Sequence, residues 1–119
     1  MSRLLSRHAL SIFRAALKAA DPALAVRRHV CLEDFETSGR IFVIGAGKAS
    51  AAMAQAVERL LGKRIAGGFL NVKYGHGAKL RRIEVNECGH PVPDSNGLRG
   101  ALRISEIARD AVEGDLVVC

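Results

Sequence analysis

The segment that most constrains the fold is "IFVIGAGKAS", residues 41 to 50. Its first four residues, Ile41 to Ile44, are apolar and β-prone, and Gly45-Ala46-Gly47 follows them directly. An alanine-rich stretch with helical periodicity then runs from Lys48 to about Leu61. The sequence therefore predicts a buried strand, a tight glycine turn and a helix N-terminus, which together form a building unit of α/β sheets.

Helices and strands are also predicted on both sides of this unit. Asp21-Pro22 indicates the N-cap and first residue of a short helix, Gly62 a helix C-terminus, and Asp94 or Ser95 the cap of a last helix. The remaining helices are predicted over residues 1–20, 22–29 and 95–112, and the remaining strands over 67–72, 83–87 and 116–119. The order, helices followed by β-α-β-β-α-β, predicts an α/β fold with a mostly parallel sheet and flanking helices.

The connection between the second and third predicted strands leaves one topological question open. Only about ten residues separate Val72 from Ile83, which is short for a parallel crossover. The third strand is therefore expected either to run antiparallel or to be reached through a loop without a helix.

The N-terminal twenty residues form one amphipathic pattern. Its apolar stripe, at helical spacing, consists of Leu5, Ala9, Ile12, Phe13, Ala16, Leu17 and Ala20. This stripe predicts a first helix that packs against the rest of the domain. Four basic residues and no acid precede Asp21, so a mitochondrial presequence or a membrane-surface helix is the alternative.

Composition excludes several classes of protein. Eighteen Lys and Arg against twelve Asp and Glu give a net charge of +6, but four Phe, one Tyr and no Trp offer few stacking platforms for nucleic acid. Three cysteines without CxxC spacing argue against a disulfide framework or a zinc site and favour a reducing cytoplasm. No apolar run approaches the roughly 18 residues that span a bilayer. We expect one cytoplasmic domain that binds a small molecule, without nucleic acid, membrane or metal ligands.

The glycine turn matches neither common nucleotide motif. Ser50 stands where a dinucleotide fingerprint needs Gly or Ala, and a Walker loop would need Gly in place of Phe42 and Ser or Thr in place of Ala49. The backbone N–H groups of Gly47 to Ser50 at a helix N-terminus are still suited to an anion. Lys48 there opposes the helix dipole by about 0.3–1 kcal/mol, which favours a bound anion nearby, although a solvated lysine is the plainer alternative.

Four motifs, "VIGAGKAS", "VKYGHG", "ECGHPVPDSN" and "GDLVVC", resemble the N-terminal part of the class II glycerate kinases. These are the MOFRL-associated glycerate 2-kinases, some of which have also been labelled hydroxypyruvate reductases. The resemblance implies a Rossmann-like domain and ATP- and Mg²⁺-dependent phosphorylation of the 2-hydroxyl of D-glycerate to give 2-phosphoglycerate. The reaction is implied to take place between this domain and a C-terminal domain.

Members of that family are several times longer than 119 residues. They carry a Ser-Gly-Gly-Gly-Ser phosphate loop after the strand that Leu116 to Cys119 match, and then a second domain. We therefore expect residues 1–119 to be an incomplete N-terminal domain, with a helical lead over 1–32 and an α/β part over 40–119. Alone, without the missing C-terminal domain, this part is expected to have little or no kinase activity.

The resemblance assigns the candidate site residues. Lys48 is expected to be catalytic, by contacting the transferred phosphoryl group or the substrate carboxylate. Substrate or nucleotide binding is expected at Gly45, Gly47, Ser50, His90 and Asp94. For His90 the alternative is a ring bonded to nearby backbone, and for Asp94 it is a helix N-cap.

Two roles stay open for residues in and after the glycine-bearing loop before the third strand. Lys73, Tyr74 and His76 are expected either to line the cleft or to be solvated, and Glu87 either to orient a lysine or to lie on the surface. The arginine pairs 27–28 and 81–82 are expected on solvated faces.

Two other functions stay open. One is an NAD(P)H-dependent hydroxypyruvate reductase, although no acidic residue ends the second predicted strand, where Asn71-Val72-Lys73 stand. The other is a non-catalytic fragment. The sequence leaves the preferred sugar acid and the oligomeric state, including a homodimer, undecided.

Overall fold

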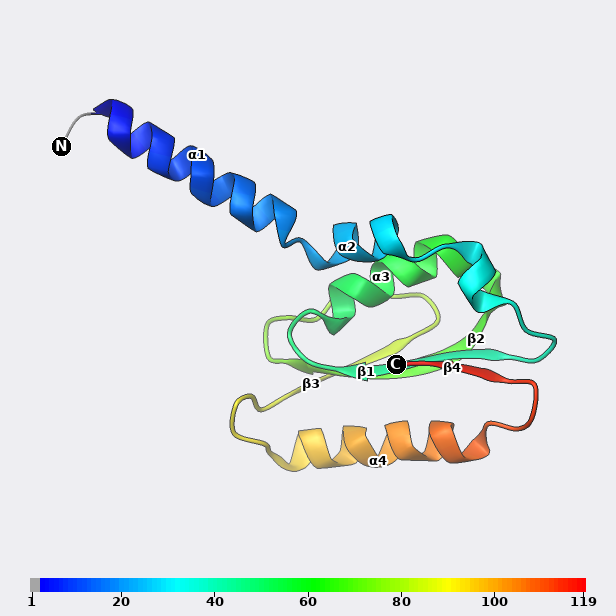
Figure 1. The fold of residues 1–119 in the computed structure, drawn as a ribbon. Helices are drawn as coiled ribbons and strands as arrows, with labels where there is room; N and C mark the ends of the chain where they lie inside the picture. Colours follow the sequence, from blue (N-terminus) through cyan, green and yellow to red (C-terminus); the bar gives the residue numbers. More distant parts are fainter. Residues whose placement is uncertain (1–2) are drawn as a thin grey trace.

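A computed structural model of the chain describes residues 3–119 as a four-stranded parallel sheet with helices on both faces (Figure 1). The strands are β1 (Ile41–Ala46), β2 (Ile65–Lys73), β3 (Glu84–Cys88) and β4 (Leu116–Val118), in the order β3-β2-β1-β4. The helices are α1 (Arg3–Ala19), α2 (Pro22–His29), α3 (Ser50–Leu61) and α4 (Ser95–Asp110), with short 3-10 turns η1 (Leu32–Phe35) and η2 (Gly62–Arg64). Helices α2 and α3 cover one face of the sheet, and α4 covers the other.

The core lies between the sheet and α3. Four strand residues, Ile41, Ile65, Leu70 and Val72, are the largest fully buried side chains. Helix α3 packs onto them with Ala51, Ala54, Ala56, Val57 and Leu61. Small alanine side chains let the helix approach the sheet closely, and each buried aliphatic side chain stabilises the fold by roughly 1.5–3 kcal/mol.

The predicted helix caps are confirmed, but α3 begins later than predicted. Asp21 accepts a hydrogen bond from the Leu24 N–H at 2.7 Å, and Asp94 accepts one from the Gly97 N–H at 2.9 Å. Helix α3 starts at Ser50 rather than at Lys48. The chain leaves β1 through Gly47 at φ +117, and the intervening residues are used to complete a turn closed by a Ser50 N–H to Gly47 C=O bond of 3.2 Å.

Strand β3 is parallel to β2, with Leu70 opposite Val85 and Lys73 opposite Cys88. Of the two arrangements left open by the sequence, the crossover without a helix is the one observed. Side chains of α3 hold this loop in place of a crossover helix. The Glu58 carboxylate accepts the backbone N–H groups of Arg81 and Arg82 at 2.9 and 2.7 Å.

Helix α1 forms as predicted, but it does not pack against the rest of the domain. No α1 side chain is buried, and Ile12, Phe13 and Leu17 are 71%, 58% and 58% exposed. The prediction of a packed first helix is therefore wrong for the described chain. The short connection through Asp21, whose carboxylate caps α2, directs α1 away from the sheet (Figure 1). Within residues 3–119, no helix combines the length and apolarity that crossing a bilayer requires.

The amino ends of β1 and β4 are joined by a polar cluster. The Arg40 guanidinium and the Asp115 carboxylate form an ion pair of 2.6 Å, and the Arg40 backbone N–H donates to the same carboxylate at 2.8 Å. Gly39 lies so close to the Gly114 carbonyl that a Cβ there would meet its oxygen at 2.3 Å. These contacts fix the register of the edge strand β4 on β1.

Candidate functional site

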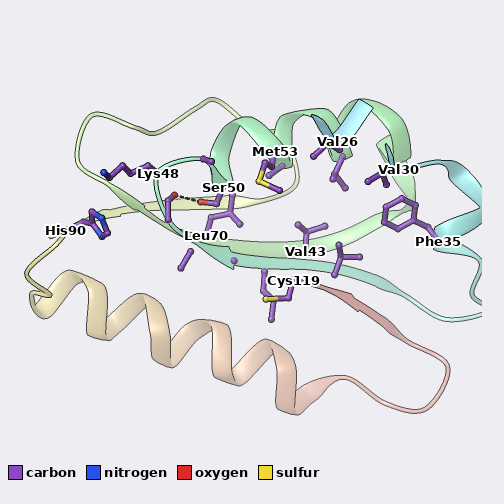
Figure 2. A pocket seen from close by; sticks show the side chains of 18 residues that line it. Val26, Val30, Phe35, Val43, Lys48, Ser50, Met53, Leu70, His90 and Cys119 are labelled. Atoms are coloured by element: carbon purple, nitrogen blue, oxygen red, sulfur yellow. Dashed lines mark hydrogen bonds between the residues drawn. The ribbon is translucent and has the colours of Figure 1, made fainter. Parts of the chain in front are cut away.

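The candidate site is a cavity of about 640 Å³ that begins at the carboxyl end of β1 and extends beneath α2 and α3 (Figure 2). Its polar end is formed by Lys48, Ser50 and His90. Its apolar part is lined by Val26, Val30, Phe35, Val43, Met53, Val57, Leu70 and Val118. A volume in this range is typical of pockets that bind small molecules.

Lys48 lies on the rim of this cavity. Its side chain is exposed and projects at the same end of the cavity as the His90 ring (Figure 2). Within residues 3–119, no carboxylate lies close enough to the Lys48 ammonium group to form an ion pair. A cation held at the cavity rim without a protein counter-charge is suited to an external anion.

The two glycines next to Lys48 contribute in different ways. Gly47 adopts φ +117, a backbone conformation that L side chains rarely adopt, and a Cβ built on it would meet nothing within 4 Å. The space above Gly47 is therefore open to a ligand. A Cβ on Gly45 would lie 3.4 Å from Leu70, so Gly45 is a position of ordinary close packing in the strand.

The set of free backbone donors differs from the predicted one. The Gly47 N–H donates to the Asn71 carbonyl at 2.9 Å and the Ser50 N–H to the Gly47 carbonyl, while the Ser50 hydroxyl donates to that same carbonyl at 2.7 Å. The donor groups of Gly47 and Ser50 therefore hold the turn. The next N–H groups, those of Ala51 and Ala52, have no acceptor within the helix, and no side chain caps α3.

His90 and Asp94 were predicted together, but the structure separates their roles. His90 is exposed and lines the same cavity as Lys48. Asp94 does not line it, because both of its carboxylate oxygens are engaged elsewhere: one caps α4 at the Gly97 N–H, and the other accepts the Tyr74 hydroxyl at 2.8 Å. Hydrogen bonds from the Gly97 and Gly89 N–H groups and from Tyr74 lower the Asp94 pKa. The cap alternative is confirmed.

The loop that follows β2 is organised by Glu87. One Glu87 carboxylate oxygen accepts the Gly75 N–H at 3.0 Å and the Gly77 N–H at 3.2 Å. Glu87 is exposed, so the surface alternative is confirmed, and its carboxylate also binds this loop. Tyr74 joins the same region to Asp94, and that hydrogen bond is the main cause of the raised Tyr74 pKa.

Three asparagines that sequence reasoning did not single out connect the sheet to α4. Asn71 of β2 donates to the Gly97 carbonyl at 2.9 Å, and Asn86 of β3 donates to Asn71 at 2.8 Å and to the Asn96 carbonyl at 2.9 Å. Asparagine is uncommon inside strands. The presence of asparagine at two strand positions, Asn71 and Asn86, was the feature of the sequence that could have indicated this network.

A cationic rim, open helix N–H groups and an imidazole over an apolar cavity can hold a phosphate or carboxylate group. Within residues 3–119, no three His, Cys, Asp or Glu side chains lie close enough together to hold a metal ion. The fold and the site define a Rossmann-like α/β domain whose sheet ends at a cavity with a cationic rim. The chain belongs to the family described as "Domain of unknown function (DUF4147)", which matches residues 8–119.

Similar proteins include enzymes with two different names. A glycerate 2-kinase of Pyrococcus horikoshii is 39% identical over 117 residues, and a D-glycerate 2-kinase of Thermotoga maritima is 32% identical over 115. A putative hydroxypyruvate reductase of Agrobacterium vitis is 40% identical over 107 residues. These matches cover 91%, 96% and 90% of the chain but 26%, 27% and 24% of the relatives. The chain thus spans about a quarter of their length.

Two solved structures share the fold. The crystal structure of a glycerate kinase from Thermotoga maritima has a TM-score of 0.83 at 32% identity, and that of a protein from Pyrococcus horikoshii OT3 a TM-score of 0.80 at 38% identity. They match 98% and 95% of this chain, which covers 28% of each. Both confirm the α/β fold with a parallel sheet.

Proposed function

We propose that this chain is the N-terminal, Rossmann-like part of a glycerate kinase that transfers a phosphoryl group from ATP to the 2-hydroxyl of D-glycerate. The products are ADP and 2-phosphoglycerate. The observation that carries this proposal is the placement of Lys48 on the cavity rim beside the open first turn of α3, with no counter-charge from residues 3–119. The names of several relatives support the same reaction.

Phosphoryl transfer depends mainly on positioning and on the stabilisation of charge on the transferred oxygens. In the proposed reaction the Lys48 ammonium group supplies that stabilisation, and the φ of Gly47 leaves room for the anion above the backbone. His90 donates a hydrogen bond from the same end of the cavity. We place ATP and glycerate between this edge and the remainder of the longer protein.

Mg²⁺ would supply further charge neutralisation to the nucleotide phosphates. Asp94 is committed to the α4 cap and to Tyr74, and the described residues offer no metal-binding cluster. We therefore assign the metal ion no ligand among residues 3–119. The three cysteines, Cys31, Cys88 and Cys119, are free thiols, which supports a reducing compartment such as the cytoplasm.

A reductase acting on hydroxypyruvate is the second candidate, favoured by the name given to the Agrobacterium vitis relatives. Such an enzyme would need a ribose-binding acid near the end of β2. That strand ends at Lys73. NADH oxidation in the presence of hydroxypyruvate, followed by absorbance at the nicotinamide band, distinguishes the two reactions.

The decisive experiment measures glycerate phosphorylation by the full-length protein with Lys48 replaced by alanine. We expect kcat/KM to fall about 10²–10³-fold, because an electrostatic partner of the transition state is removed. Lys63→Ala is the matched control, since Lys63 is an exposed lysine in η2, at the amino end of β2. Equal rates for the Lys48→Ala variant and the parent would refute the proposal. The 119 residues alone are expected to show little or no turnover.

A further inference from the structure

The loop after β2 has a conformation that its sequence supports at several positions. A turn closed by the His76 N–H and the Lys73 carbonyl, 2.9 Å apart, places Gly75 at φ +76, where glycine is strongly favoured. A Cβ on Gly77 would lie 3.0 Å from the Glu87 carboxylate oxygen. The two glycines and Glu87 are therefore matched to one loop conformation.

Glu87 holds this loop by charge-assisted hydrogen bonds. Its carboxylate accepts the N–H groups of Gly75 and Gly77, at 3.0 and 3.2 Å. Hydrogen bonds to a carboxylate are stronger than those between neutral groups. Removal of the carboxylate frees the part of the loop around Gly75 and Gly77, while Glu58 still holds the loop at Arg81 and Arg82.

A second contact connects the loop to the turn that carries His90. The Tyr74 hydroxyl donates to Asp94 at 2.8 Å and accepts from the Asn96 amide at 2.8 Å. The segment between Cys88 and Asp94 therefore has one end fixed in β3, and its other end, Asp94, is held both by the α4 cap at the Gly97 N–H and by Tyr74. His90 lies within this segment and lines the cavity with Lys48.

We propose that Glu87 and Tyr74 are positioning residues that hold the His90 turn against the Lys48 rim for substrate binding. This inference rests on the proposed function. Glu87 fixes the loop at Gly75 and Gly77, the Tyr74 hydroxyl ties the start of the loop to Asp94, and Asp94 fixes the end of the His90 turn. His90 contacts the substrate carboxylate or the transferred phosphoryl group, whereas Glu87 and Tyr74 touch neither.

The test uses Glu87→Ala, Glu87→Gln and Tyr74→Phe in the full-length protein. Tyr74→Phe keeps the ring and removes only the hydroxyl, and Glu87→Gln keeps one carbonyl acceptor. We expect the KM for D-glycerate to rise about tenfold in Glu87→Ala and Tyr74→Phe, and less in Glu87→Gln, because a misplaced binding group weakens substrate positioning. Glu84→Ala is the matched control, an exposed glutamate of the same strand.

Two readouts separate positioning from a general loss of structure. A purely structural defect lowers the amount of active protein and thus apparent kcat, and it leaves KM unchanged. The His90 imidazole resonances, measured by NMR, are expected to shift in Glu87→Ala and Tyr74→Phe but not in Glu84→Ala. An unchanged KM for D-glycerate in Glu87→Ala and Tyr74→Phe would overturn the inference. Unchanged His90 resonances in these two variants would overturn it as well.

The failure of the proposed function would be visible separately. If the parent protein does not phosphorylate D-glycerate, the kinase proposal is refuted. The His90 resonances then decide whether Glu87 and Tyr74 hold the His90 turn, since they report its position without any substrate.

Discussion

The buried glycine in the middle of α4 provides a prediction whose sign opposes helix propensity. Replacing an interior helical glycine by alanine ordinarily stabilises a helix by about 1 kcal/mol. At Gly100, however, an added Cβ would lie 1.7 Å from the Asn71 side-chain oxygen and 2.5 Å from its amide carbon. The Asn71 side chain must therefore move if alanine is introduced.

The cost of that movement follows from the hydrogen bonds of Asn71. Displacement of its amide breaks the bond to the Gly97 carbonyl, 2.9 Å long, and the bond received from Asn86, 2.8 Å long. Each contributes about 1 kcal/mol, and a half-buried amide left without partners costs about 1–3 kcal/mol more. After the gain of about 1 kcal/mol from helix propensity, we expect Gly100→Ala to lower the free energy of unfolding by about 2–4 kcal/mol.

Urea unfolding followed by the fluorescence of Tyr74, the one tyrosine of the chain, measures this change. Gly97→Ala is the matched control, because a Cβ there would meet only ordinary contacts at 3.6 Å or more. This control is expected to be as stable as the parent or more so. In an Asn71→Ala background the penalty at Gly100 should disappear. A stabilised Gly100→Ala variant in the parent background would refute the reasoning.

Three further predictions concern the turn, the core and the effect of acid. Gly47→Ala forces alanine to φ +117, so we expect a loss of about 1–3 kcal/mol in urea unfolding, and an unchanged midpoint would contradict this. Ile65→Ala removes a fully buried side chain and is expected to cost about 2–5 kcal/mol, against about 0.5–1.5 for Ile65→Val, measured in the same way. Hydrogen bonds from Arg40 hold the Asp115 pKa well below its ordinary value near 3.8. The ionised Asp115 therefore stabilises the fold above about pH 4, and this contribution is lost as the pH falls through the lowered pKa. Asp115→Asn should make the stability profile flatter between pH 5 and about pH 2, and an identical profile would exclude Asp115 as its origin.

Local signals in the sequence predicted most of the fold. The sequence predicted the N-caps Asp21 and Asp94 and the glycine Gly62 at the end of α3 correctly. Each of these residues interacts with the end of the helix next to it in the sequence. The strand ends shift by up to two residues. The orientation of β3 was not predictable, since its crossover is held by Glu58 of α3, a contact between distant parts of the sequence.

The candidate site was predicted in part. Lys48 and His90, 42 positions apart in the numbering, line one cavity because parallel strands end at the same edge of the sheet. The role of Asp94 as a cap, and the network through Asn71 and Asn86, depend on how α4 packs on the sheet. A periodic apolar stripe likewise shows which face of α1 is apolar, but it does not show what covers that face.

The exposure of α1 has a consequence for how the chain unfolds. A helix of 17 residues without a buried side chain gains little from the sheet, so its helix–coil equilibrium is set by its own residues and is close to the limit for isolated helices in water. Heating should melt α1 gradually, while the strands separate in one cooperative step. Circular dichroism at the helix band will therefore lose signal before Tyr74 fluorescence does, and a single melting temperature will not describe both.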